Sequence, residues 1–292
     1  MKSTLIILLF PLLVFSQTNV DTLAVTRMKE AVAFLASDSL GGRPSGTILE
    51  EHAANWIVEQ LNHSGISTSS TPFDVPFSQE ILHCKNVIGQ INNGADSTII
   101  ISAHYDHLGT GSGKSLEIVK KGIHRGADDN ASGVALMLEL AHWLANDSLA
   151  PTNYNYQFVG LSAHEIGLFG SKNYVQSELF LSLNVKLVVN LDMVGRLDHV
   201  ENKVRMSHCN TTTQLKSMLS STAISSIKIS FDDEHTTIND LTTFCDKNVP
   251  AISLTTGIHD DYHRLGDTAD KLNYEGMEKV LRLLKSILNS VF

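Results

Sequence analysis

Histidine and carboxylate side chains follow three apolar, strand-like runs of the sequence, and more of them lie in two polar loops. At the strand ends they are His104 with Asp106, His164 with Glu165, and Asp192, and the loops read "GADDNASG" (126–133) and "HDDYHRLGDT" (259–268). An ionisable side chain at the end of a buried strand is unfavourable unless it is paired or binds a metal. Because His, Asp and Glu without Cys form the donor set of catalytic zinc sites, the sequence predicts a catalytic metal site.

The adjacent pair His164 and Glu165 matches the start of the H-E-x-x-H zinc signature. That signature requires a second histidine four residues after the first, and Leu168 occupies this position. The signature is therefore excluded. Taken alone, the pair is equally typical of polar residues at the surface end of a strand, and the carboxylates and histidines at the other strand ends favour the metal site.

Alternating patterns along the chain indicate the elements that position these side chains. Helical spacing of apolar residues predicts helices over 26–40, 48–62, 131–146 and 274–288, and apolar runs predict strands over 86–91, 97–106, 156–163, 185–191 and 251–255. This alternation predicts a single α/β domain with a mainly parallel central sheet. In such sheets functional sites lie at the carboxyl ends of the strands, where the ionisable residues are found.

The chain as a whole indicates export and gives no sign of nucleic-acid binding. Of its 292 residues, 42% are hydrophobic, and the net charge is −9 with a pI near 5.8, which argues against a nucleic acid as partner. Residues 1–16, "MKSTLIILLFPLLVFS", have a basic start and a short apolar stretch, which predicts a signal peptide. We therefore expect a periplasmic or secreted protein without integral membrane association. The sequence indicates no oligomeric state.

Three cysteines are an odd number for an exported chain. Either one disulfide forms, in which case Cys209–Cys245 is the favoured pair, or all three are small buried side chains. They are too scattered for a thiolate zinc site.

Six motifs occur in an order that is typical of one family. They are "LASDSLGGRPSGT" (35–47), "SAHYDHLG" (102–109), "GADDNASG" (126–133), "HEIGLFGS" (164–171), "NLDMVGR" (190–196) and "DYHRLGDTADKLNYEGM" (261–277). Through them the chain resembles the secreted co-catalytic dizinc exopeptidases, which include bacterial leucyl aminopeptidases and share their fold with glutaminyl cyclases and the transferrin receptor ectodomain. The resemblance implies one domain over 17–292, with helices on both faces of the sheet in the three-layer, phosphorylase/hydrolase-like zinc-peptidase architecture.

The resemblance also implies a complete set of ligands for two zinc ions. His104 and Asp192 correspond to the ligands of one zinc, and Glu165 and His263 to those of the other. Asp129 corresponds to the carboxylate that bridges both. Two metals held in this way clamp and activate one water molecule.

Other residues have expected supporting roles. Tyr262 resembles the family's tyrosine that donates a hydrogen bond to the tetrahedral oxyanion. Asp106 lies two residues after His104 along the predicted strand and so points to the same side, where its carboxylate can accept a hydrogen bond from the imidazole and fix the metal-binding tautomer. The resemblance further implies a cis peptide bond between Asp129 and Asn130. His259 is expected to take no part.

One position departs from the family pattern. The residue before the metal-binding glutamate is normally a second glutamate, the general base, and here it is His164. A neutral imidazole can accept a proton from water, because its ordinary pKa near 6.5 suits that role. The protonated imidazole would, however, lie close to two dications. The substitution leaves the ligand set intact and bears on catalytic efficiency.

The sequence thus predicts a zinc-dependent exopeptidase acting on short peptides, with an aminopeptidase as the leading hypothesis. A carboxypeptidase or a glutaminyl-cyclase-like enzyme would use the same motifs. A binding protein that kept the fold and its zinc but lost efficient turnover is a third hypothesis. His164 argues for it, and the complete ligand set argues against it.

Overall fold

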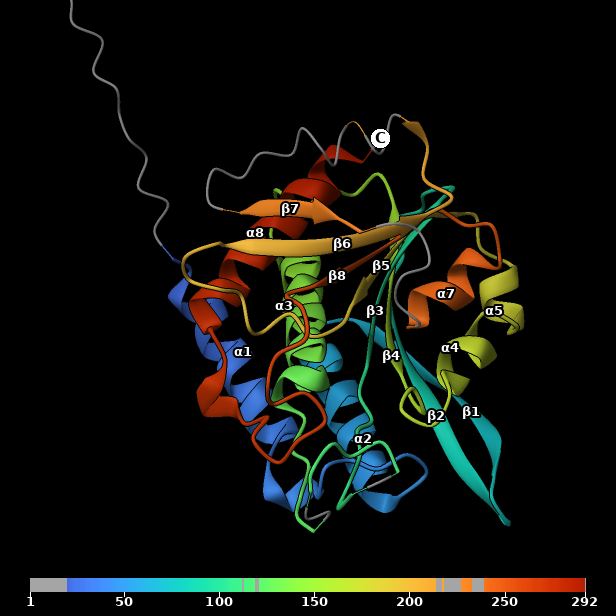
Figure 1. Cartoon of the computed structure of the whole chain (residues 1–292). Helices are drawn as coiled ribbons and strands as arrows, with labels where there is room; N and C mark the ends of the chain where they lie inside the picture. Colours follow the sequence, from blue (N-terminus) through green and yellow to red (C-terminus); the bar gives the residue numbers. More distant parts are fainter. Residues whose placement is uncertain are drawn as a thin grey trace, which may run out of the picture.

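The computed structural model describes residues 20–111, 113–118, 121–213, 217, 227–232 and 239–291. One mixed sheet of eight strands forms the centre, in the order β1-β2-β4-β3-β5-β8-β6-β7 (Figure 1). The strands are β1 (Ser67–Phe77), β2 (Glu80–Ile91), β3 (Thr98–His104), β4 (Asn155–Leu161), β5 (Val185–Leu191), β6 (Lys203–Cys209), β7 (Lys228–Phe231) and β8 (Ala251–Thr255). The predicted signal peptide, residues 1–16, lies outside the described residues.

The middle of the sheet is parallel, as predicted. Strands β4, β3, β5 and β8 are neighbours that run in the same direction, whereas β2 joins β4 and β6 joins β8 in antiparallel pairs. Every residue of β3 is buried, since the run Ile99-Ile100-Ile101 packs against helices on both faces. The single α/β domain is therefore confirmed.

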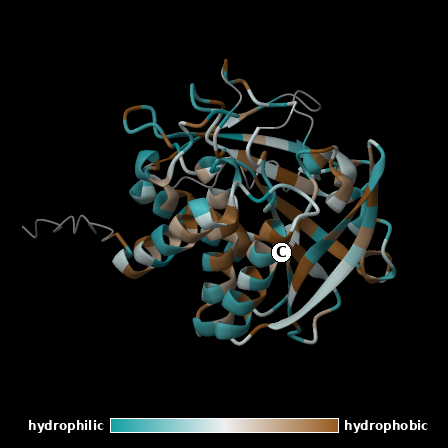
Figure 2. Cartoon of the chain, turned by 90° about the horizontal axis from the view of Figure 1, so that it is seen from below, coloured by the Kyte–Doolittle hydropathy of each residue, from teal (hydrophilic) through white to brown (hydrophobic). Residues whose placement is uncertain are grey.

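Helices cover both faces of the sheet and complete a three-layer arrangement (Figure 1). On one face lie α1 (Thr22–Leu35), α2 (Ile48–His63), α3 (Gly133–Asn146) and α8 (Tyr274–Ser290), and on the other α4 (Phe169–Tyr174), α5 (Glu178–Leu181) and α7 (Asp240–Cys245). Apolar segments of the helices and strands lie in the interior, with hydrophilic segments on the outside (Figure 2). None of the helices in the described ranges is long and apolar enough to cross a membrane.

Several element boundaries differ from the predictions. The first helix begins at Thr22 rather than residue 26, because the Asp21 side chain accepts hydrogen bonds from the backbone amides of Leu23 and Ala24. Strand β3 ends at His104 rather than at residue 106. The first, sixth and seventh strands were not predicted, and β1 is largely exposed at the edge of the sheet.

The favoured cysteine pairing is confirmed. Cys209, the last residue of β6, forms a disulfide with Cys245 at the end of α7, and Cys84 is a buried free thiol. The bond fastens the C-terminal end of α7 to the sheet.

Candidate active site

The carboxyl ends of three parallel strands position one half of the predicted site. His104 is the last residue of β3, Glu165 lies in the turn after β4, and Asp192 directly follows β5. The register brings them together, because His104 pairs with Leu161 at the end of β4. The backbone amide of Asp192 donates a hydrogen bond to the carbonyl of Leu254 on β8 at 3.1 Å, which ties Asp192 to the neighbouring strand.

All five residues expected to bind metal lie in one cluster, with Asp129 at its centre. One carboxylate oxygen of Asp129 is 3.3 Å from Nε2 of His104, which is also 3.7 Å from the Asp192 carboxylate. The other oxygen of Asp129 is 3.2 Å from Nε2 of His263, which lies 3.4 Å from the Glu165 carboxylate. Asp129 thus presents one oxygen to each of two His–carboxylate pairs, as a bridging ligand must.

The backbone around Asp129 is held by several contacts. The peptide bond between Asp129 and Asn130 is cis, as the family resemblance implies. The carboxylate of Asp267 accepts the amides of Asp128 and Asp129 at 3.0 Å. The side chain of Asn130 donates to the carbonyl of Leu191 at 2.9 Å, which ties this segment to the end of β5.

The cluster has the chemistry of a metal site. The buried Nε2 of His104 has no hydrogen-bond partner among the described residues and faces two carboxylates. Burial lowers the pKa of His104, but the neighbouring carboxylates outweigh burial and hold that pKa well above its usual value. Burial raises the pKa of Asp129, yet the imidazoles of His104 and His263 hold it well below its usual value. Buried carboxylates of this kind require positive charge, which divalent cations supply while leaving the imidazoles neutral.

Asp106 supports the cluster differently from the prediction. Nδ1 of His104 donates to the backbone carbonyl of Asp106 at 3.2 Å, whereas the carboxylate is 3.7 Å away. The carboxylate instead accepts the amides of His164 and Glu165, each at 3.0 Å, and the hydroxyl of Ser45 at 2.8 Å. The tautomer of His104 is fixed by the carbonyl, and the turn that carries Glu165 is fixed by the carboxylate.

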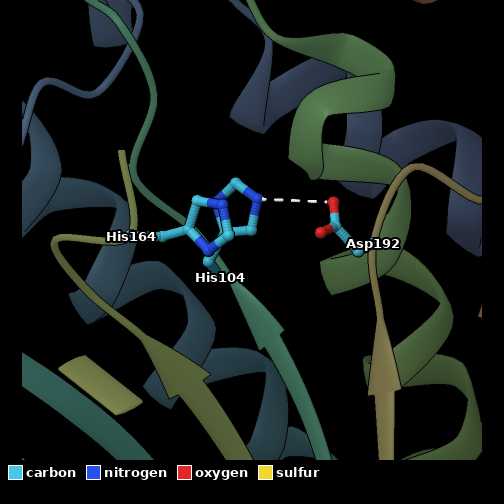
Figure 3. Close-up of side chains that lie close together, drawn as sticks. All are labelled: His104, His164 and Asp192. Carbon is cyan, nitrogen blue, oxygen red and sulfur yellow. Dashed lines mark ion pairs between the residues drawn. The ribbon is translucent and has the colours of Figure 1, made fainter. Parts of the chain in front are cut away.

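His164 lies beside the cluster and stacks on His104 (Figure 3). The ring centroids are 3.8 Å apart and the planes differ by 8°. Nδ1 of His164 is 2.8 Å from the carboxylate of Asp240. Burial and the neighbouring His104 lower the pKa of His164. The carboxylates of Asp240 and Asp192 outweigh these two effects and raise the pKa of His164 to about 8.

Two residues near the site were not predicted. Asp240 is the first residue of α7, and no local pattern connects it to His164. His107 is 2% exposed, and its Nδ1 lies 3.0 Å from the Glu165 carboxylate. The signal for His107 was its place three residues after His104, within the same motif.

His259, expected to take no part, lies 3.2 Å from the carboxylate of Asp128, the residue before Asp129.

A pocket opens beside the cluster and includes Tyr262. The ring of Tyr262 stacks on His263 with centroids 3.9 Å apart. Burial and the charges of Asp129 and Glu165 raise the pKa of the Tyr262 hydroxyl, so it keeps its proton and can donate a hydrogen bond. Residues that line the pocket include Asp129, His164, Asp192, Arg205, Ser207, Asp232, Asn239, Ser253, Thr255 and Tyr262.

Comparison with known proteins gives the family and fold. The model of peptidase family M28 matches residues 86–288. The chain is 28% identical to the uncharacterized protein YfbL of Escherichia coli, over 95% of this chain and 94% of that protein. Its structure resembles the zinc aminopeptidase of Bacillus subtilis, with a TM-score of 0.73 and 15% identity over 90% of this chain and 94% of the other. It also resembles the glutaminyl cyclase of Fimbriiglobus ruber, with a TM-score of 0.74 and 21% identity over 90% and 94% of the two chains.

Proposed function

The chain belongs to peptidase family M28, and from this membership we propose that it is an exported zinc-dependent exopeptidase that removes the N-terminal residue of peptides. The observation that carries the proposal is the position of Asp129, whose two oxygens face His104 at 3.3 Å and His263 at 3.2 Å. A carboxylate shared by two histidine–carboxylate pairs suits a two-metal hydrolase.

Five residues would hold two zinc ions. His104 and Asp192 would bind one ion, Glu165 and His263 the other, and Asp129 both. Zinc when bound acts as a Lewis acid toward a carbonyl and lowers the pKa of water. The unpartnered Nε2 of His104 fits this assignment, because a metal-binding imidazole keeps that lone pair free.

The remaining roles belong to groups that line the pocket. His164 takes a proton from the attacking water and delivers it to the leaving amine. Tyr262 keeps its hydroxyl proton and donates it as a hydrogen bond to the oxyanion that develops on the scissile carbonyl. The carboxylates of Asp192 and Asp129 also line the pocket, so a peptide held there lies beside the metal positions.

Aminopeptidase activity is favoured over the alternatives on the same fold. The solved structures that the chain resembles include a protein titled a zinc aminopeptidase as well as a glutaminyl cyclase. Curated relatives that the chain matches include proteins named leucine aminopeptidase 1, and this favours cleavage at the N-terminus. Export follows from the signal peptide predicted over residues 1–16 and agrees with the disulfide between Cys209 and Cys245.

A panel of short peptides tests the proposal. Each sequence is supplied with a free N-terminus, with an acetylated N-terminus, with an amidated C-terminus and with N-terminal glutamine. We expect free amino acids from peptides with a free N-terminus, no release from the acetylated ones, and loss of release after chelation that added zinc restores. Release from the C-terminus would assign a carboxypeptidase, and cyclisation of glutamine without hydrolysis would assign a cyclase. No turnover of any peptide by the zinc-loaded protein would favour a binding protein.

A further inference from the structure

We propose that Asp240 is the positioning residue for His164, so that an aspartate–histidine dyad occupies the place of the single glutamate base. The inference rests on the proposed function in taking His164 as the base. Asp240 comes from α7, 76 residues along the chain from His164.

The contact between the two residues is short and buried. Nδ1 of His164 and a carboxylate oxygen of Asp240 are 2.8 Å apart, and the side chains are 13% and 1% exposed. A carboxylate can only accept here, so in the neutral imidazole Nδ1 carries the proton and Nε2 carries the lone pair. His164 lines the pocket, while the contact with Asp240 fixes the tautomer whose Nε2 can accept a proton.

The helix that presents Asp240 is rigidly fixed. Asn239 caps its start through the amide of Leu241 at 3.0 Å and also donates to Ser253 on β8 at 3.3 Å. Phe244 is fully buried against aromatic residues of the neighbouring helices. The disulfide at Cys245 fastens the other end of the helix. Asp240 therefore holds a fixed position.

The stacking geometry favours a base over a further metal ligand. His104, His164 and Asp192 offer ligand atoms within 4.8 Å of one another, so a shared ion is the rival assignment. The lone pair of an imidazole nitrogen lies in the plane of its ring. Because the planes of His104 and His164 are parallel to within 8° and their ring centroids are 3.8 Å apart, the rings are stacked rather than coplanar, and an ion in the plane of one ring lies outside the plane of the other.

Charge gives Asp240 a second effect on the base. A glutamate base loses its charge when it accepts a proton, whereas His164 becomes a cation beside the metal site. The buried carboxylate of Asp240 is the counter-charge for that cation, 2.8 Å away. The dyad thereby restores the charge balance that one glutamate would provide.

Activity measurements of Asp240→Asn in two backgrounds, the parent and His164→Glu, test the dyad. In the parent, Asp240→Asn should lower kcat by about 10²–10⁴-fold, the usual worth of a positioned base, with little change in KM or zinc content. In a His164→Glu background the same change should cause no loss, because Asp240 then only repels the new carboxylate. Asp246→Asn, at the exposed C-terminal end of the same helix, is the matched control and should leave kcat unchanged. Equal losses from Asp240→Asn in both backgrounds would overturn the proposal.

A spectroscopic readout separates this inference from the proposed function. Long-range proton–nitrogen correlation spectra of zinc-loaded protein labelled in histidine should show His164 protonated at Nδ1, and Asp240→Asn should shift that tautomer. An unchanged His164 tautomer in Asp240→Asn, or a zinc-bound nitrogen at His164, would overturn the dyad. If the parent hydrolyses no peptide, the proposed function fails, while the tautomer still decides whether Asp240 positions His164.

Discussion

His104 and His164 lie face to face, with ring centroids 3.8 Å apart and planes within 8° of parallel (Figure 3). His104 belongs to the cluster of expected metal ligands, whereas His164 contacts the carboxylate of Asp240. The two rings are in contact, but Nε2 of His104 faces the metal cluster and Nδ1 of His164 faces Asp240. Substitutions at His164 should therefore change the chemistry of the site and spare its affinity for metal.

The variant His164→Ala, which lacks the imidazole, should have a kcat about 10²–10⁴-fold lower with zinc content preserved, because a positioned base contributes that much. His164→Glu should keep or raise the rate, since it restores the family's arrangement. Steady-state kinetics with metal analysis of both variants decides this. Hydrolysis by His164→Ala at the parent's rate would exclude His164 as the base. A parent that is inactive and becomes active only as His164→Glu would be a zinc-bound protein that has lost catalysis.

Asp129→Ala should remove both activity and most of the bound zinc. The carboxylate faces His104 and His263 with separate oxygens, so its loss weakens both metal positions at once. Metal content after dialysis against zinc-free buffer measures the effect. Retention of one full zinc equivalent would show that Asp129 does not bridge.

Asp106→Ala should weaken zinc affinity only about 10–100-fold, as is usual for a residue that orients ligands. Its carboxylate holds the amides of His164 and Glu165 at 3.0 Å, while the tautomer of His104 depends on a backbone carbonyl that the substitution leaves in place. Competition with a zinc-binding dye gives the affinity. A loss of zinc as complete as that of Asp129→Ala would contradict this division of roles.

Opening the disulfide should lower the free energy of unfolding by about 2–4 kcal/mol, because Cys209 and Cys245 close a loop with a sequence separation of 36. Urea unfolding of the Cys209→Ala, Cys245→Ala double variant measures it. Cys84→Ala is the control for the loss of one buried thiol. Equal stability of the double variant and the parent would refute this contribution.

Glu50→Gln should change the pH dependence of stability. Burial, followed by the negative charge of Asp106, raises the pKa of Glu50 to about 8 from its usual value of 4.5. The folded chain then keeps a proton that the unfolded chain releases, so this stabilisation is complete below about pH 4.5 and is lost as pH rises through about 8.

Urea unfolding of zinc-loaded protein at a series of pH values tests the role of Glu50. The parent should lose stability between about pH 5 and 8 more steeply than Glu50→Gln. Glu51→Gln, at the exposed neighbouring position, should follow the parent. Parallel pH profiles for the parent and Glu50→Gln would contradict the raised pKa.

The sequence predicted the centre of the fold and the position of the cluster, because both depend on local patterns. The β-branched run Ile99-Ile100-Ile101 identified a strand buried on both faces. Parallel neighbours then bring their carboxyl ends to one edge, which gathers His104, Glu165 and Asp192. The edge strand β1 was missed because it is polar, contains Pro72 and Pro76, and is mostly exposed.

Contacts between distant segments could not be read from local patterns. Asp240 reaches His164 only through the packing of α7, and its sequence neighbours give no sign of it. The error over Asp106 came from the boundary of a strand. Alternation of side chains holds only within a strand, and β3 ends at His104, so Asp106 turns toward the following loop instead.

We expect Asp129 to join two metal positions. Anomalous diffraction at the zinc edge, from crystals of the zinc-loaded protein, locates each ion. We predict two peaks, one beside His104 and Asp192 and the other beside Glu165 and His263, with the Asp129 carboxylate between them. A single peak beside one pair, or zinc held away from Asp129, would show that Asp129 does not bridge two metal ions.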